Sequence, residues 1–408
     1  MKEVPMLSAP YGMPPGADEV DVIVGANVPA PRGFRTHVAN VGIKDDTPDF
    51  SVIASDRPCV ADAVFTRSRF AGASVLLSRQ HLATGDPRAI VTVSKNANVA
   101  TGAPGQHDAE ELTERVAQLL GTATEDVLVA STGVIGRRYP MQRIVDHLDS
   151  GPALVPADLP SVARAIMTTD TFPKMAAATC GDAVVVGIAK GVGMIEPDMA
   201  TLLVYLVTDA EVPADKLRSA FRDVVDLTFN SLSVDTDTST SDTAVILANG
   251  AAGPVPTAEF RRVLYAVTRA LVLQLARDGE GATKLLQVTV AGARDARQAK
   301  RVAKAIVNSP LVKTAAHGAD PNWGRVVMAI GKCSDETDIE QQKVRVCFGD
   351  VEVYPREIGD SELHAITEHM RRPAIEINVE LGTGSAGATV WGCDLSDGYV
   401  RINADYTT

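Results

Sequence analysis

The sequence predicts an α+β fold: a layered α/β sandwich with a smaller C-terminal α+β domain. Strand-like segments occur in consecutive groups as well as between helices, which favours a sandwich over a doubly wound parallel sheet. A length of 408 residues is typical of two domains. Hydrophobic residues make up 45% and aromatic residues 4%, so the expected core consists of Ala, Val, Leu and Ile. We expect a flexible arm rich in Pro and Gly over 1–30, the sandwich over 31–285 and the second domain over 286–408.

The first half of the chain alternates β-branched runs with helical patterns. In chain order we expect a strand then a loop in "AIVTVSKNANVA" (89–100), an amphipathic helix in "DAEELTERVAQLL" (108–120), a buried strand in "DVLVAST" (126–132), a helix in "SVARAIM" (161–167) and a strand in "AVVVGIAK" (183–190).

The second half continues in the same way. The expected elements are a strand at 201–209, a helix at 214–232, a strand at 243–249, a long helix at 257–281 that ends at glycine, a strand at 285–292 and a helix at 295–309, followed by mixed elements.

Charge and cysteine content restrict the class of protein. The net charge is −12 and there is no long basic run, so nucleic acid is not an expected partner. Neither a run of 18 apolar residues nor an apolar N-terminal leader occurs, so we expect no membrane span and no signal peptide. The cysteines are odd in number and lack CxxC spacing, which indicates reduced thiols in the cytoplasm. They are Cys59, Cys180, Cys333, Cys347 and Cys393.

No segment predicts a metal or cofactor site. "VDTDTSTSDT" (234–243) begins like a calcium loop but lacks glycine at the sixth position, and Ile246 stands where a bidentate Glu is needed. "GVG" (191–193) lacks the third glycine of a dinucleotide fingerprint, and no GxxxxGK[ST] motif occurs. We expect neither a metal nor a cofactor.

A candidate nucleophile lies in "KGVGMIEPDMATLL" (190–203). The chain has no GxSxG elbow, whereas a threonine becomes a nucleophile when it is the first residue of a chain and its own α-amine serves as base. Cleavage between Ala200 and Thr201 would produce that state. The residues alone also allow a purely structural interpretation, in which Thr201 is only the first residue of a buried strand.

Further blocks of the chain accompany this segment. They are "NANVATG" (96–102), "STGVIG" (131–136), "AIMTTDTFPK" (165–174), "FNSLSVDTDTSTSDT" (229–243), "DGEGATKL" (278–285), "VNSPLVKTAAHGADPNWGRV" (307–326) and "GYVRINADYTT" (398–408). Together, from about Pro31 to Thr408, they resemble the ornithine acetyltransferase family, also called glutamate N-acetyltransferases. The closest resemblance is to the paralogue of clavulanic-acid-type antibiotic gene clusters.

The resemblance implies a sandwich of the self-processing N-terminal-threonine type. The precursor would cleave itself into an α chain of residues 1–200 and a β chain of residues 201–408, assembled as α2β2 or larger. Thr201 would take acetyl from N2-acetyl-L-ornithine as an ester and pass it to L-glutamate. By similarity, the Thr132 hydroxyl and the Gly133 N–H would stabilise the oxyanion.

The resemblance also implies a substrate-binding set. A lysine such as Lys190 can pair with an α-carboxylate, and a carboxylate such as Glu280 suits an ammonium group. The remaining positions lie on loops and in the C-terminal tail. The full set is Thr168, Lys190, Thr201, Glu280, Asn403 and Thr408.

Two alternative functions stay open. In the first, a self-processing amidase or acyltransferase acts on a related modified amino acid in an antibiotic pathway. In the second, an unprocessed protein only binds amino acids. The sequence leaves undecided whether acetyl-coenzyme A is also a donor.

Overall fold

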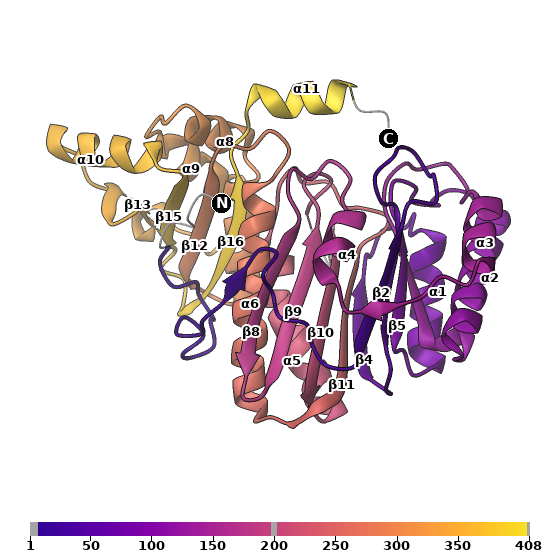
Figure 1. Ribbon diagram of the computed structural model, residues 1–408. Helices are drawn as coiled ribbons and strands as arrows, with labels where there is room; N and C mark the ends of the chain where they lie inside the picture. Colours follow the sequence, from indigo (N-terminus) through magenta and orange to yellow (C-terminus); the bar gives the residue numbers. More distant parts are fainter. Residues whose placement is uncertain (1–6, 197–201, 406–408) are drawn as a thin grey trace. The chain divides into compact units, whose positions relative to one another are not determined.

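A computed structural model describes residues 7–196 and 202–405 of the protein (Figure 1). These residues form two compact units. The larger unit contains 15–196, 202–230 and 237–271, and the smaller unit contains 7–14, 231–236 and 272–405. The division therefore falls inside helix α6 (Thr257–Arg277), whereas the sequence suggested a boundary after residue 285.

Two sheets form the centre of the larger unit. The six-stranded sheet has the order β1-β8-β9-β10-β11-β4 and the five-stranded sheet has the order β6-β5-β3-β2-β7. The first comprises β1 (Ile23–Val24), β8 (Lys174–Cys180), β9 (Ala183–Lys190), β10 (Leu203–Glu211), β11 (Thr243–Pro254) and β4 (Val60–Phe65). The second comprises β6 (Val127–Ser131), β5 (Ala89–Val93), β3 (Phe50–Ser55), β2 (Phe34–Ala39) and β7 (Val155–Pro156).

The two sheets pack face to face around an apolar core. Alternate residues of each strand point to opposite faces, so Ile90 belongs to the core between the sheets while Val91 belongs to the core on the helical side. Tyr205 reaches across from β10, and its hydroxyl lies 2.7 Å from Thr92 Oγ1 of β5. This hydrogen bond links β10 of one sheet to β5 of the other.

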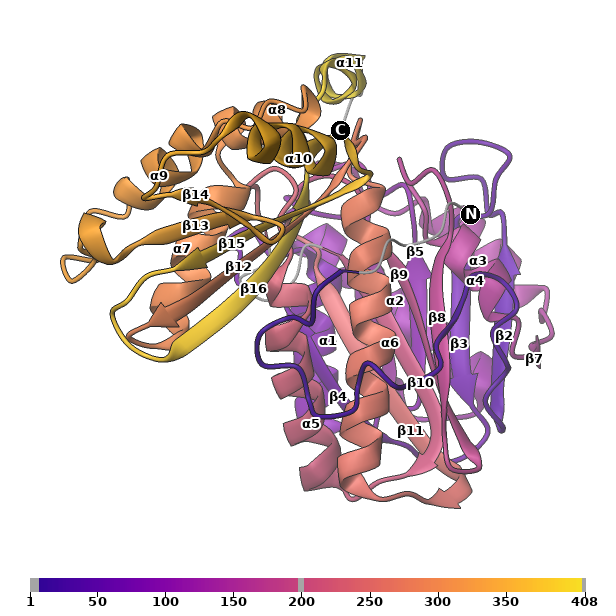
Figure 2. The same cartoon turned by 90° about the vertical axis from the view of Figure 1, so that its left-hand side faces the viewer.

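Helices cover the outer faces and complete an α/β/β/α arrangement of layers (Figure 1). The layered α/β sandwich that the sequence predicted is confirmed. Leu112 and Val116 of α2 pack on the five-stranded sheet. On the other sheet, a Cβ added at Gly187 of β9 would lie 3.2 Å from Val267 of α6, so glycine allows this helix to approach closely (Figure 2). The covering helices are α1 (Ala73–Thr84), α2 (Gly102–Leu120), α3 (Met141–Asp149), α5 (Ala214–Leu227) and the first part of α6. Leu159 and Val162 of α4 (Leu159–Ala165) belong instead to the core between the two sheets.

The smaller unit is a five-stranded sheet with helices, in the order β14-β13-β15-β12-β16. Its core is built from Val, Ile and Leu of the sheet and from Val302 and Ile306 of α7. The strands are β12 (Leu285–Ala293), β13 (Arg345–Phe348), β14 (Val351–Tyr354), β15 (Ala374–Glu380) and β16 (Ala386–Cys393). The helices are α7 (Ala296–Val307), α8 (Pro310–His317), α9 (Trp323–Gly331), α10 (Asp360–Arg371) and α11 (Asp397–Asp405).

The described part of the first 30 residues differs from the expected flexible arm. Within the smaller unit, the Tyr11 N–H donates to Thr389 Oγ1 at 2.8 Å and the Tyr11 hydroxyl donates to the Ser385 carbonyl at 2.7 Å. Within the larger unit, β1 pairs with β8 through Ile23 and Val24. Backbone pairing and hydrogen bonds to distant segments hold these residues despite their Pro and Gly content.

Two expectations from composition can be compared with the described residues. All five cysteines lie in the described ranges and are free thiols. Of the helices in those ranges, none combines the length and the apolar character that a membrane crossing requires.

Candidate active site

Thr132 and Gly133 directly follow β6, at the end of the five-stranded sheet. The Thr132 N–H donates to the Val93 carbonyl at 3.2 Å, which continues the pairing of β6 with β5. Gly133 has φ +122°, and a Cβ there would lie 2.3 Å from the carbonyl carbon of Lys95. Only glycine fits this turn without a shift of the backbone.

The turn presents two hydrogen-bond donors. Lys190 Nζ donates to Thr132 Oγ1 at 3.2 Å, and an ammonium group has no acceptor, so the Thr132 O–H is directed elsewhere. Within the described ranges, neither this O–H nor the Gly133 N–H has an acceptor in the protein. Both residues are half-buried. An oxyanion bound here would therefore meet unsatisfied donors.

Lys190 is the last residue of β9 and lies in the six-stranded sheet. It is 9% exposed and pairs with Leu203, the first residue of the neighbouring strand β10. The residue that precedes Leu203 is also held, because the Leu202 carbonyl accepts from the Thr243 N–H at 3.0 Å. A buried cation thus stands beside the start of β10.

Asp170 is a central residue of this site that the sequence analysis missed. Its Oδ1 accepts from Lys174 Nζ at 2.6 Å and from the Gly191 N–H at 2.9 Å. Its Oδ2 accepts from the Thr168 N–H at 3.1 Å. Lys174 is fully buried, so the pair is shielded from water. The only sequence signal was its position in the "AIMTTDTFPK" block.

The charges around Asp170 determine its protonation state. Burial by itself would raise the pKa of this carboxyl group, but the positive charges of Lys174 and Lys190 and the hydrogen bonds from Lys174 and Gly191 lower it below its ordinary value. The group is therefore an anion at neutral pH, and it compensates two buried ammonium groups.

The backbone N–H of Thr168 connects this residue to Asp170 and, through Asp170, to the end of β9. Its N–H is bound by the Asp170 carboxylate that also binds the N–H of Gly191, the residue after Lys190. The structure therefore brings together four of the residues expected at the site, Thr132, Gly133, Thr168 and Lys190, all within the larger unit.

The segment after Lys190 is held in an unusual conformation. Met194 has φ +56°, a region that residues with side chains rarely adopt. Ile195 forms a β-bridge with Thr238, and the Glu196 N–H donates to the Asp237 carbonyl at 2.9 Å. The polar turn around Asp237 therefore supports the segment that leads to the expected cleavage site. Ala200 and Thr201 themselves lie outside the described residues.

Glu280 and Asn403 are described within the smaller unit. Asn403 of α11 donates from Nδ2 to Glu280 Oε2 at 2.8 Å. Thr408 lies outside the described residues. The structure thus brings Glu280 and Asn403 together, as a carboxylate with an amide beside it.

The loop after Glu280 is anchored by Asp394, which the sequence analysis also missed. Asp394 Oδ1 accepts from the N–H groups of Thr283 and Lys284 at 2.7 and 2.9 Å. Its Oδ2 contacts Thr283 Oγ1 at 2.5 Å and His317 Nδ1 at 2.8 Å. Thr283 and His317 belong to two of the quoted sequence blocks, but 111 residues separate Thr283 from Asp394. No spacing rule connects such distant positions.

Among residues 7–196 and 202–405, no group of three or more His, Cys, Asp or Glu side chains is arranged to hold a metal ion.

Substitution of Thr132 by alanine tests the oxyanion role. We expect the rate of acyl transfer to fall about ten- to a thousandfold, which is the range for the loss of one such donor. Substrate affinity should change much less, because the donor acts on charge that develops in the transition state. Single-turnover kinetics with a binding titration separate the two, and Thr132→Ser is the matched control that keeps the hydroxyl. Full turnover by the alanine variant would restrict Thr132 to a structural role.

Comparison with known proteins assigns the family. Residues 35–408 match the ArgJ family. "Arginine biosynthesis bifunctional protein ArgJ 2" of Nostoc sp. is 57% identical over 379 residues, which cover 93% of this chain and 98% of that protein. "Glutamate N-acetyltransferase Oat2" of Streptomyces clavuligerus is 54% identical over 386 residues, which cover 93% and 98%. A solved structure of an ArgJ protein from Bacillus halodurans is 39% identical with a TM-score of 0.46, and covers 50% of this chain and 98% of that chain. The resemblance that the sequence blocks indicated is confirmed, and the chain belongs to the ArgJ family.

Proposed function

We propose that this protein is a self-cleaving N-acetyltransferase that moves acetyl from N2-acetyl-L-ornithine to L-glutamate. Family membership supports the activity, and the name of the Streptomyces clavuligerus relative, a glutamate N-acetyltransferase, supports glutamate as the acceptor. The donor, N2-acetyl-L-ornithine, is the one that the resemblance of the sequence blocks implies. One observation of the structure carries the proposal: the buried Lys190 ammonium at Thr132 Oγ1, beside the Gly133 N–H and the first residue of β10. This arrangement suits an oxyanion next to a nucleophile at the start of a chain.

In the proposed reaction, cleavage of the Ala200–Thr201 bond releases the α-amine of Thr201. This amine takes the proton of Thr201 Oγ as the oxygen attacks the acetyl carbonyl carbon. The resulting oxyanion is stabilised by the Thr132 O–H and the Gly133 N–H. The C–N bond then breaks, ornithine leaves with the proton, and acetyl remains as an ester on Thr201.

The second half of the reaction reverses these roles. The amine of glutamate attacks the ester carbonyl, and the same donors stabilise the second oxyanion. The C–O bond breaks, the proton returns to Thr201 Oγ, and N-acetylglutamate leaves. Glu280, Asn403 and Thr408 are proposed to bind the substrates together with Thr168 and Lys190, with Glu280 facing an ammonium group.

The sheet explains how the two chains would stay together after cleavage. β9 precedes the cut and β10 follows it, and the two strands pair in antiparallel register from Leu203 with Lys190 to Thr208 with Val185. β10 also pairs with β11, so it is an inner strand of the sheet. We propose that the α and β chains remain one folded unit in the cytoplasm and assemble as α2β2 or larger.

Steady-state kinetics test the proposed transfer. We expect parallel double-reciprocal plots for N-acetylornithine at several glutamate concentrations, because the acetyl group resides on the enzyme between the two substrates. Mass spectrometry should detect a β chain heavier by one acetyl group when glutamate is withheld. Intersecting plots without any acetylated β chain would exclude the mechanism.

A control reaction separates transfer from hydrolysis. Acetate release that proceeds at the same rate with and without glutamate would favour the alternative of a self-processing amidase. An uncleaved chain that binds amino acids without turnover would favour a binding protein.

A further inference from the structure

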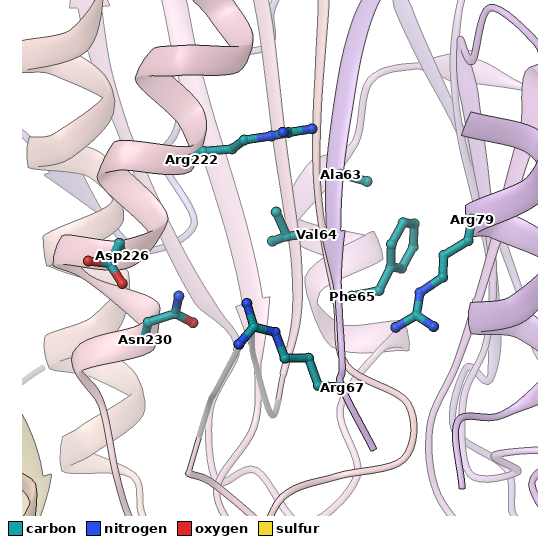
Figure 3. A pocket seen from close by; sticks show the side chains of 8 residues that line it. All are labelled: Ala63, Val64, Phe65, Arg67, Arg79, Arg222, Asp226 and Asn230. Carbon is teal, nitrogen blue, oxygen red and sulfur yellow. The ribbon is translucent and has the colours of Figure 1, made fainter. Parts of the chain in front are cut away.

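A pocket of about 430 Å³ lies in the larger unit, beside strand β4 and helices α1 and α5 (Figure 3). None of its lining residues belongs to the proposed active site. The lining residues are Ala63, Val64 and Phe65 of β4, Arg67, Arg79 of α1, Arg222 and Asp226 of α5, and Asn230. We propose that this pocket is a second ligand site, which binds a small anion through carboxylate or phosphate oxygens.

The charge of the lining favours an anion. Three guanidinium groups face one lining carboxylate, that of Asp226. Arg222 is further paired with the buried Asp62, at 2.9 Å from Nε to Oδ2 and 3.1 Å from NH2 to Oδ1. Arg79, by contrast, has no carboxylate partner among the described residues, on a chain whose net charge is −12. A guanidinium group without such a partner attracts small anions.

Arg79 is the arginine best placed to bind a ligand. Its guanidinium donates to the Thr66 carbonyl and lies 5.9 Å from the ring centroid of Phe65. A carbonyl and a ring orient the group without neutralising its charge. Among the described residues Arg79 has no carboxylate partner, and a guanidinium carries five N–H donors, so donors remain for a ligand.

The strand at the pocket contributes backbone donors. Among the described residues, β4 is the last strand of its sheet and pairs with β11 alone, from Phe65 opposite Thr243 to Val60 opposite Ala248. The Thr66 N–H donates to the Asp242 carbonyl at 3.0 Å, and hydrogen-bonded pairs alternate along an antiparallel ladder. The N–H groups of Phe65 and Ala63 are therefore directed to the open edge, where the pocket lies.

Figure 3 shows how the side chains surround this edge. Arg67 extends toward the side on which Asp226 and Asn230 lie, while Arg79 approaches β4 from α1 beside Phe65. A ligand with two or three anionic oxygens can meet guanidinium groups on both sides of the strand. A compact organic polyanion or a phosphate group has this chemistry.

Calorimetric titration of the full-length protein tests the proposal, with citrate and inorganic phosphate as probes at constant ionic strength in chloride buffer. We expect saturable binding at one site per chain. Arg79→Gln should raise Kd about tenfold or more, because a charge-assisted hydrogen bond is lost. Asp226→Asn should lower Kd severalfold, because it removes the lining carboxylate that repels the anion.

Two controls locate the ligand. Arg218→Gln removes a guanidinium from the exposed face of α5, outside the pocket lining, and should leave Kd unchanged. Thr132→Ala alters the proposed active site and should also leave Kd unchanged, so failure of the proposed enzyme activity does not affect this test. Thermal melting confirms that each variant is folded. Arg79→Lys keeps the positive charge but loses the planar guanidinium group with its paired N–H donors, so it should show an intermediate Kd.

The possible outcomes of the titration either identify the chemical class of the ligand or overturn the proposal. Binding of citrate alone identifies carboxylates, binding of phosphate alone identifies phosphate groups, and binding of both identifies any compact oxyanion, provided that Arg79→Gln weakens it. The proposal is overturned if neither probe binds. It is also overturned if Arg218→Gln weakens binding as much as Arg79→Gln does, or if folded Arg79→Gln and Asp226→Asn both bind like the parent protein.

Discussion

Replacement of Thr201 by alanine is expected to abolish both chain cleavage and acetyl transfer. The parent protein should convert to two chains, and the new N-terminus should read Thr-Leu-Leu-Val-Tyr. The variant should remain a single chain of 43.0 kDa, because it lacks the oxygen that attacks the Ala200 carbonyl. Transfer should fall by at least about 10⁴-fold, as for the loss of other covalent nucleophiles.

Denaturing electrophoresis with N-terminal sequencing follows the cleavage, and a coupled assay follows the transfer. Thr201→Ser is the matched control, because a serine hydroxyl can attack the same bond and is expected to cleave, although more slowly. A Thr201→Ala protein that still splits between residues 200 and 201 without added protease would disprove the self-cleavage mechanism.

Replacement of Asp170 by alanine should cost about 3–5 kcal/mol of unfolding free energy. The carboxylate is the buried anion between Lys174 and Lys190, and its removal leaves two buried ammonium groups without that charge. It also removes the acceptor of the Gly191 and Thr168 N–H groups. Urea unfolding of the parent and the variant measures the difference.

A double variant distinguishes charge compensation from simple packing. Asp170→Asn combined with Lys174→Met removes the anion together with its fully buried partner, and should recover part of the stability that Asp170→Asn loses alone. Strictly additive losses would show that the two charges do not interact.

The pH dependence of stability follows from the lowered pKa of Asp170. The carboxylate is stabilised in the folded state, so its contribution is fully present above the unfolded-state pKa, which is about 3.9. The contribution is lost as the pH falls through the lower folded-state pKa. The difference in urea midpoint between the parent and Asp170→Asn should therefore become smaller as the pH falls from about pH 5 to pH 3, and a constant difference would contradict this origin.

Hydrophobic pattern predicted most elements of the larger unit. The strand expected at 183–190 occurs as β9 with the same bounds, because an apolar run limited by Gly and polar residues allows little else. The helix expected at 214–232 ends instead at Leu227. Thr228 turns its hydroxyl back to the Val224 carbonyl at 2.6 Å, and its own backbone is no longer helical. Periodicity does not detect such local competition for hydrogen bonds.

The N-terminal arm and the domain boundary were not predictable from composition. Prolines and glycines suggested a flexible segment, yet Tyr11 is bound by residues more than 370 positions away. Residues 231–236 belong to the smaller unit, where the Ser233 N–H donates to the Trp391 carbonyl at 2.9 Å. Such pairings depend on which distant segments meet in the folded chain, and local composition does not predict them.

The sequence by itself determined the candidate nucleophile, the glycine turn after β6 and the family, because these depend on residue types at short spacing. Only the tertiary structure decided that Lys190 meets Thr132, 58 positions away, and that Asp170 joins Lys174 to the Gly191 N–H. The reason is physical: the ends of β6 and β9 are brought together by the packing of two sheets, and a buried ammonium group in that space requires a buried carboxylate.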